Sequence, residues 1–127
     1  RVCAAVHAGW KGTVAKIVEK TAKRMIDNRG SNPSDIHAYI GPCISLAHFE
    51  VGDEVAAQFD EAFKSRKGSK WYVDLKAANA AQLQALGIQQ LEIDPSCTVE
   101  NNDDFFSHRN EKGLTGRMLA LIGFQIT

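Results

Sequence analysis

Residues 2–13 read Val2-Cys3-Ala4-Ala5-Val6-His7-Ala8-Gly9-Trp10-Lys11-Gly12-Thr13. The apolar run 2–7 is typical of a buried strand, and the two glycines that follow it mark a tight corner. Thr13 can cap a helix over 14–28, where apolar residues recur at three- and four-residue spacing. A strand that turns directly into a helix with one core-facing side indicates a fold that mixes both elements.

The rest of the chain continues this alternation. Strands are predicted at 36–40, 71–73, 88–93 and 118–126, and helices at 51–64 and 75–86. The segment 65–69 reads as a solvated loop. The last segment is nearly all apolar, so we expect a buried strand that could pair beside 2–6. The predicted class is mixed α/β of the α+β type, with layered sheets and packed helices.

Composition excludes several classes of protein. The 127 residues suit one domain, and fifteen Lys and Arg balance fifteen Asp and Glu. We therefore expect no nucleic-acid partner, and no apolar run is long enough to predict a membrane span. Three cysteines without a CxxC pair do not predict a disulfide framework. They favour a location in the reducing cytoplasm.

The start of the chain is unusual. Arg1 leads straight into the apolar run, without Met and without a polar lead. We therefore expect residues 1–127 to be the C-terminal part of a longer domain.

His7 is the first candidate for chemistry. On a strand it shares a face with Cys3, and a Cys and a His together could bind metal. Four residues at about 3.3 Å each, however, place them roughly 13 Å apart. One tetrahedral zinc cannot join them, so Cys3 is predicted to be a small core residue. His7 itself remains either a metal ligand or a structural histidine.

Other polar positions leave two interpretations open. Cys43 and His48 could form a nucleophile and base, or a buried cysteine beside an exposed histidine. A zinc site from Cys43, Cys97 and a histidine is conceivable, but no spacing is diagnostic. Arg109 and Arg117 flank a polar loop and could bind a phosphate or carboxylate, or could simply be solvated.

Three stretches together resemble the bacterial laccase-domain family, also called polyphenol oxidase-like, which includes purine nucleoside phosphorylases and peptidoglycan editing factors. These stretches are 5–13, with its Ala-Gly-Trp motif; 40–44 followed by 49–52; and 97–98 followed by 105–109 and 115–118. Their order and spacing fit the C-terminal part of that family through essentially the whole chain.

The resemblance implies a fold similar to that of toxin cysteine deamidases and a zinc site of two histidines and one cysteine. One of those ligands maps here, onto His7, and the others belong to the family's N-terminal part. Cys43 is then interpreted as structural. Lys11, Arg109 and Arg117 become candidates for substrate or anion binding, although Lys11 replaces the usual Arg and the 110–114 loop looks altered.

The function implied is a zinc-dependent enzyme of purine nucleosides. It would use phosphate to cleave adenosine, inosine or methylthioadenosine, and would also deaminate adenosine. Copper is the alternative metal by family description, but four scattered histidines are too few for several coppers. The rivals are a hydrolase that edits peptidoglycan precursors, a laccase-like phenol oxidase, and an inactive binding or assembly fragment. Alone, this chain is expected to carry no stoichiometric zinc, to be inactive and to self-associate.

Overall fold

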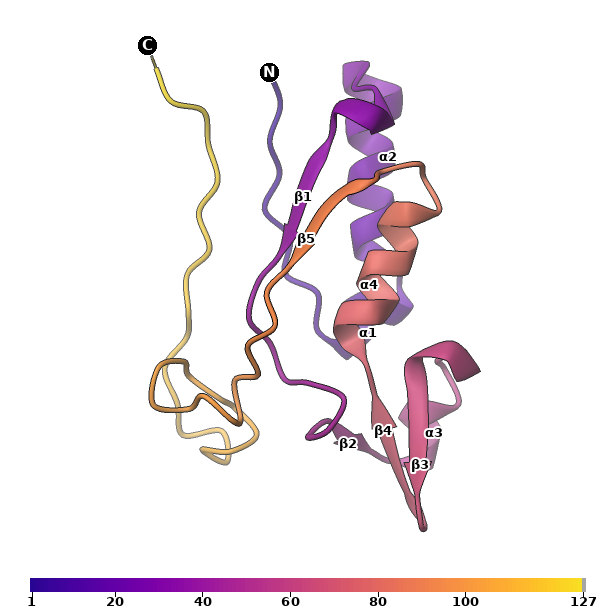
Figure 1. Cartoon of the computed structure of the whole chain (residues 1–127), viewed down its shortest axis with the longest axis vertical. Helices are drawn as coiled ribbons and strands as arrows, with labels where there is room; N and C mark the ends of the chain where they lie inside the picture. Colours follow the sequence, from indigo (N-terminus) through magenta and orange to yellow (C-terminus); the bar gives the residue numbers. More distant parts are fainter. Residues whose placement is uncertain (127) are drawn as a thin grey trace.

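The computed structural model describes residues 1–126, in which two small sheets lie beside a set of helices (Figure 1). In chain order the helices and strands are α1 (Trp10–Val14), α2 (Ile17–Arg29), β1 (His37–Ile40), β2 (Glu50–Val51), α3 (Asp53–Ala56), β3 (Lys64–Lys67), β4 (Lys70–Val73), α4 (Leu75–Gln84) and β5 (Gln90–Ile93). Short 3-10 turns occupy Pro33–Asp35 and Glu61–Phe63. The predicted mixture of helices and strands is confirmed.

The two sheets differ in direction. β1 and β5 pair in parallel, with His37 opposite Gln90 and Ile40 opposite Ile93. β2, β4 and β3 form an antiparallel sheet with β4 in the middle. The strands predicted at 36–40, 71–73 and 88–93 are therefore present, each within a few residues of its predicted bounds.

Each sheet has its own hydrophobic cluster. One cluster contains Ile36, Leu83 and Ile88 and joins β1 and β5 to α2 and α4. The other lies beside the three-stranded sheet and contains Phe49, Phe59, Val73, Leu75 and Ala78; we call it the lower cluster. Because α4 contributes to both clusters, it holds the two sheets in one structure.

The helix predicted at 14–28 is divided in two. α1 begins earlier than predicted, at Trp10, and the chain breaks at Lys16, whose φ of 58° is left-handed. A left-handed φ is unfavourable for a side chain larger than glycine's, so this break is imposed by its surroundings. Within the described residues, no helix has the length and apolar character needed to cross a membrane.

The helix predicted at 51–64 is wrong as an element. Only Asp53–Ala56 is α-helical, and the 3-10 turn Glu61–Phe63 follows. The four apolar side chains that would share one helix face nevertheless all reach the lower cluster: Val51, Val55, Phe59 and Phe63. The predicted residues therefore do pack in the core, but the backbone bends at Asp60 instead of continuing as a helix.

The solvated loop predicted at 65–69 is also wrong. Residues 64–67 form β3, which pairs with β4 so that Lys67 faces Lys70 across a two-residue turn. Gly68 in that turn has a φ of 62°, a conformation that glycine adopts at little cost. The Lys-Gly-Ser-Lys sequence was a hairpin signal.

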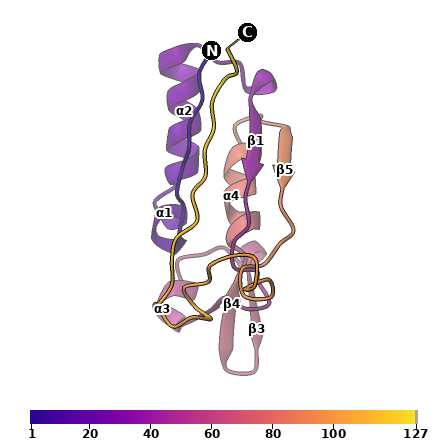
Figure 2. The same ribbon diagram turned by 90° about the vertical axis from the view of Figure 1, so that its left-hand side faces the viewer.

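The segments 2–7 and 118–126 are extended but make no ladder with any described strand. They run alongside each other in opposite directions (Figure 2), with Cys3 Sγ 3.9 Å from the Ile122 carbonyl oxygen. The prediction of a buried last strand is wrong, because Leu119 and Leu121 are more than four-fifths exposed. No described segment covers these side chains. Cys3 is likewise exposed, not in the core.

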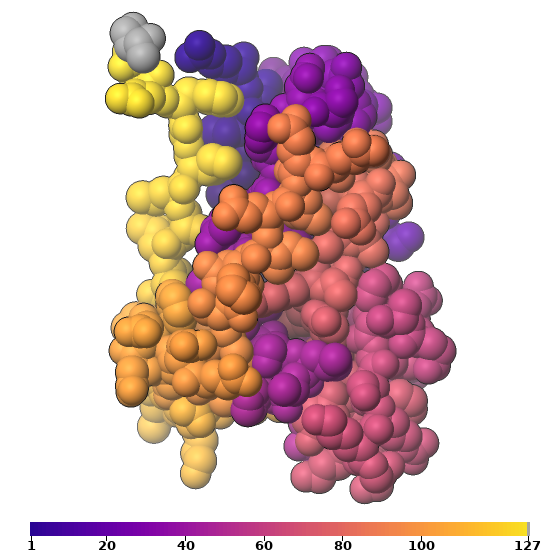
Figure 3. Space-filling view, viewed as in Figure 1, coloured from indigo at the N-terminus to yellow at the C-terminus, as the bar shows by residue number. Residues whose placement is uncertain are grey.

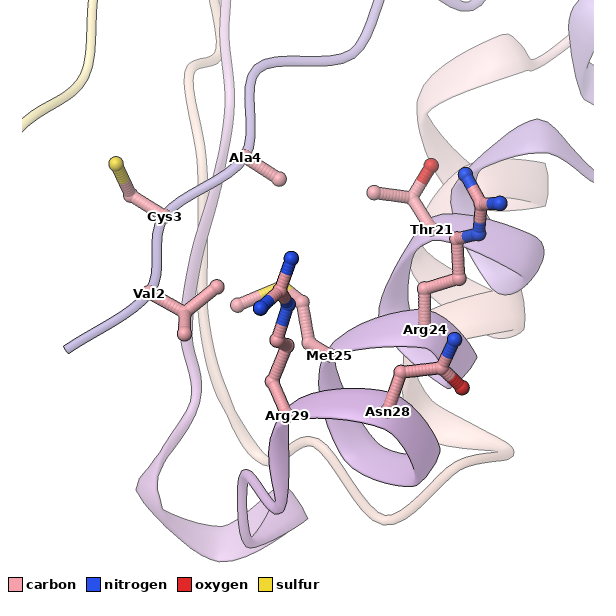
Figure 4. Close-up of a pocket in the computed structure, with 8 residues that line it drawn as sticks. All are labelled: Val2, Cys3, Ala4, Thr21, Arg24, Met25, Asn28 and Arg29. Atoms are coloured by element: carbon pink, nitrogen blue, oxygen red, sulfur yellow. The ribbon is translucent and has the colours of Figure 1, made fainter.

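A hollow of about 550 Å³ separates residues 2–4 from α2. Val2 and Ala4 point toward the helix, whereas Cys3 points away, as alternate residues of an extended segment do (Figure 4). Arg24 and Arg29 edge the hollow on the helix side. None of the predicted site residues lines it.

Candidate functional site

The corner after His7 is held by a hydrogen bond of its own and by two from α4. The Thr13 hydroxyl donates to the Gly9 carbonyl at 2.8 Å, and the buried Asn79 amide donates to the Thr13 hydroxyl at 3.1 Å. Gln82 donates to the Thr13 carbonyl at 2.9 Å. Because Asn79 and Gln82 lie one turn apart on α4, that helix fixes where the corner sits.

His7 lies at the end of the extended segment, two residues before this corner, and is exposed. Its imidazole makes no hydrogen bond to any residue in the described range 1–126. A side-chain Cβ at Gly9 would lie 3.8 Å from His7 Nε2, so glycine leaves space beside the ring. An exposed imidazole with no hydrogen bond to the protein is chemically suited to bind a metal.

Lys11 is exposed on α1, with its ammonium 5.6 Å from the centre of the Trp10 ring. Trp10 is half-buried and packs against the lower cluster. The lysine therefore keeps its charge in solvent while its neighbour anchors the corner. α1 has only five residues, so its dipole adds little to anion binding.

Arg109 lies over the Phe49 ring, with its guanidinium carbon 5.4 Å from the ring centre. Its Nη1 donates to the Glu50 carbonyl at 2.8 Å. These contacts fix the arginine against the lower cluster, and the side chain stays exposed. A positioned guanidinium with free donors is well suited to bind phosphate or carboxylate.

Arg117 forms hydrogen bonds within its own loop. Its Nη1 donates to the carbonyls of Thr115 and Gly116 at 3.2 and 3.0 Å. Within the described residues, no hydrogen bond or ion pair joins it to His7, Lys11 or Arg109.

One carboxylate, that of Glu111, organises the 102–115 loop. It accepts hydrogen bonds from the Thr115 hydroxyl at 2.6 Å, the Ser107 backbone N–H at 2.8 Å and the Asn102 amide at 3.1 Å. The Thr115, Ser107 and Asn102 bonds, in that order, hold the pKa of Glu111 below its ordinary value. The 110–114 segment thus contains the residue that shapes the loop beside Arg109.

Glu111→Gln is expected to loosen this loop, because Oε2 accepts all three hydrogen bonds and a neutral amide oxygen is a weaker acceptor than a carboxylate oxygen. Limited proteolysis should cut the 102–115 segment faster, whereas the exposed Glu92→Gln should change nothing. Because folding lowers the pKa of Glu111, its contribution exists above the unfolded pKa and is lost as pH falls through the folded pKa. The wild-type loop should therefore also become cleavable in acid. Equal cleavage of both variants would contradict this assignment.

The three motifs meet at the lower cluster. Trp10 comes from the first, Ile44, Phe49 and Val51 from the second, and Arg109 of the third lies over Phe49. Arg109 and the Trp10–Lys11 corner are thus brought to one cluster from opposite ends of the chain. We predict that at least one of Arg109 and Arg117 faces the same cleft as His7.

The sequence left open a zinc site of Cys43, Cys97 and a histidine, but the structure groups Cys97 with His48 and Glu100, and Glu100 was not predicted. His48, Cys97 and Glu100 place one ligand atom each within 4.8 Å of one another and could bind a metal. His48 Nε2 lies 3.0 Å from a Glu100 carboxylate oxygen. The sequence analysis considered His48 together with Cys43, because no local pattern predicts a contact between His48 and Cys97, which are 49 positions apart. The three-residue spacing of Cys97 and Glu100, typical of one turn, was the only available signal.

The two interior cysteines differ in chemistry. Burial raises the pKa of the Cys43 thiol to about 11, so it stays protonated and unreactive, as its structural interpretation requires. Burial also raises the pKa of Cys97, but the Ser45 side chain and backbone N–H groups around the sulfur outweigh it. The pKa of Cys97 is therefore below its ordinary value, which favours the thiolate.

Known proteins resemble this chain along almost all its length. A purine nucleoside phosphorylase of Deinococcus radiodurans is 42% identical over 126 residues, covering 96% of this chain and 49% of the relative. The purine nucleoside phosphorylase YlmD of Bacillus subtilis is 38% identical, and the match covers 94% of this chain and 46% of the YlmD chain. The chain thus spans about half the length of the curated relatives it matches.

Solved structures agree with the sequence relatives. YlmD from Geobacillus stearothermophilus matches with a TM-score of 0.80 at 31% identity, over 87% of this chain and 45% of that one. The hypothetical protein YfiH of Bacillus licheniformis matches with a TM-score of 0.78 at 36% identity, over 85% and 44%. The family model described as multi-copper polyphenol oxidoreductase laccase matches residues 1–125. The chain therefore belongs to the multi-copper polyphenol oxidoreductase laccase family.

Proposed function

We propose that this chain is the C-terminal part of a zinc-dependent purine nucleoside phosphorylase that cleaves adenosine, inosine or methylthioadenosine with phosphate. The observation that carries the proposal is the meeting of the three motifs at the lower cluster, which holds Arg109 and the Trp10–Lys11 corner against one core. The names of the relatives support the same reaction. Adenosine deamination is proposed as a secondary activity.

His7 is the residue of this chain that would hold the metal. Its exposed imidazole suits a zinc ligand, and Gly9 leaves space beside it. The other histidine and the cysteine of the site would come from the N-terminal part of the family's domain. When bound, zinc supplies a Lewis acid that polarises oxygen and activates water.

The charged side chains would bind the anionic substrate. Arg109 keeps donors free while one Nη1 is fixed to the Glu50 carbonyl, so it can bind phosphate in a defined place. Lys11 adds a second positive charge at the corner as a point charge, without a bidentate fork. Arg117, whose Nη1 donates to the Thr115 and Gly116 carbonyls, is proposed as a further contact of the anion. With phosphate held, the chain's part in the reaction is to orient it for attack on the ribose.

The arrangement of possible ligands argues against a multi-copper oxidase. Several coppers need several clusters of His and Cys ligands. Only one group of three possible ligands occurs within residues 1–126, and it contains a single histidine. A hydrolase that edits peptidoglycan precursors remains the rival enzyme.

Arg109→Ala is expected to raise the phosphate KM roughly 10- to 100-fold, which corresponds to losing a charge-assisted hydrogen bond of about 1.5–3 kcal/mol. The free energy of unfolding should fall by less than this binding energy, because the side chain is exposed. Arg66→Ala is the matched control, since Arg66 also lies over an aromatic ring, Trp71, and donates to a backbone carbonyl. Phosphate kinetics and thermal unfolding of both variants check this. An unchanged phosphate KM in Arg109→Ala would remove this residue from the anion site.

Product analysis tests the proposed reaction. The protein at its relatives' full length should convert inosine and phosphate to hypoxanthine and ribose 1-phosphate, with no reaction when phosphate is left out. A muramyl-peptide precursor should stay intact under the same conditions. Release of amino acids from that precursor, with inosine untouched, would favour the editing hydrolase.

A further inference from the structure

We propose that His48, Cys97 and Glu100 form a second metal site, separate from His7, that binds one zinc ion and joins two loops of the domain. These residues carry an imidazole nitrogen, a sulfur and a carboxylate oxygen, which are the three donor types that zinc takes from proteins. The site lies within this chain alone, so it does not depend on the proposed nucleoside activity. It replaces the sequence-based expectation that the isolated chain carries no stoichiometric zinc.

The three ligand atoms are already close. His48 Nε2 and the Glu100 oxygen are 3.0 Å apart, and all three atoms lie within 4.8 Å of one another. Ligands about 2.0–2.3 Å from a tetrahedral zinc are roughly 3.3–3.8 Å from each other. Small side-chain rotations therefore suffice to bring them around one ion, with the fourth position left for water.

Backbone hydrogen bonds hold the ligands in place. The N–H groups of His48 and Phe49 both donate to the Ser45 carbonyl, at 3.1 and 2.9 Å, which closes the turn that presents His48. Asn101 donates to the Cys97 carbonyl from its backbone at 2.8 Å and its side chain at 3.0 Å. This closes the turn that places Cys97 and Glu100 on one side.

The sulfur has the surroundings of a metal ligand. The Ser45 backbone N–H donates to Cys97 Sγ at 3.3 Å, as outer groups around a ligating thiolate do. Cys97 is 1% exposed, so a bulky electrophile cannot reach the sulfur, which disfavours a nucleophilic role.

Access and charge are consistent with zinc. The side chains of His48 and Glu100 are 37% and 56% exposed, so the ion can enter from their side. A thiolate and a carboxylate balance the two positive charges of zinc, with a neutral imidazole as third ligand. In the space-filling view the 41–49 segment (purple to magenta) and the loop after β5 (orange) lie against each other (Figure 3).

Zinc here would also support Arg109. His48 precedes Phe49 and Glu50, which are the two residues that Arg109 contacts. Joining the 45–48 and 97–100 turns would therefore stiffen the surface on which Arg109 rests. The expected role is structural.

Titration of the 127-residue chain with Zn²⁺, and with Co²⁺ as a spectroscopic probe, tests the site. Wild type should bind one equivalent, show the absorption of a cobalt–thiolate bond, and unfold at a temperature higher by roughly 5 °C or more at saturating zinc. His48→Gln and Glu100→Gln, at exposed positions, should each weaken binding at least about 10-fold. Cys97→Ala should remove the thiolate absorption.

His37→Gln and Cys43→Ala are the matched controls and should bind zinc like wild type. In the isolated chain His7→Gln should also keep the one tightly bound equivalent, because a single imidazole binds zinc only weakly. Because His7→Gln leaves this site intact, the result is independent of the nucleoside activity. Absence of zinc binding by wild type would overturn the proposal. Binding that survives His48→Gln and Glu100→Gln would do so too, as would alkylation of Cys97 as fast as the exposed Cys3, unslowed by zinc.

Discussion

His7→Gln is expected to abolish phosphorolysis and remove the catalytic zinc when made in the protein at its relatives' full length. Gln keeps a polar side chain of similar reach but lacks the imidazole nitrogen that binds zinc. A catalytic metal contributes several kcal/mol of transition-state stabilisation, so activity should fall on the order of 10³-fold or more. Metal content and inosine turnover are measured on the same sample.

His37→Gln is the control for this change. His37 is also exposed but lies on β1, outside the three motifs, so metal content and activity should match wild type. The fold should survive both changes, because neither ring is buried. A His7→Gln protein that keeps its nucleoside activity would exclude His7 from the catalytic site.

The 127-residue chain alone is expected to have no nucleoside phosphorylase activity. His7 is the one family ligand that it carries, and a single imidazole binds zinc weakly. Adding the segment that corresponds to the family's N-terminal part should restore activity to the mixture. The same segment should cover the exposed apolar side chains of 118–126, such as Leu119 and Leu121.

Size and activity of the mixture check this second expectation. Alone, the chain should self-associate through its uncovered apolar surface, and addition of the segment should yield a defined complex. Zinc bound by His48, Cys97 and Glu100 would not replace the catalytic zinc, because that site is separate from His7. Full turnover of inosine by the chain alone would show that residues 1–127 contain a complete active site.

Elements specified by local patterns were predicted well. The α4 helix, predicted at 75–86, and the strands at 36–40 and 88–93 appear close to their predicted bounds. The 51–64 helix failed because the same four apolar residues can reach a cluster from a bent backbone. The buried last strand failed because burial depends on a covering partner, which the pattern 118–126 does not contain.

In the candidate site, too, residues within short motifs could be predicted, whereas contacts between distant residues could not. His7, Lys11 and Arg109 are proposed from short motifs, each contained within a few residues of sequence. The contact of Arg109 with Phe49 and Glu50, and the grouping of His48 with Cys97, join residues about fifty or more positions apart. Such pairs depend on how loops meet in space, which spacing along the chain does not specify.

Anomalous X-ray scattering at the zinc edge, from crystals of the full-length protein, tests the central claim most directly. The account predicts a zinc peak about 2.0–2.1 Å from a nitrogen of His7. A peak among His48, Cys97 and Glu100 would be the second site and would not substitute for the first. Zinc-loaded, phosphorolytically active crystals without a peak at His7 would contradict the account.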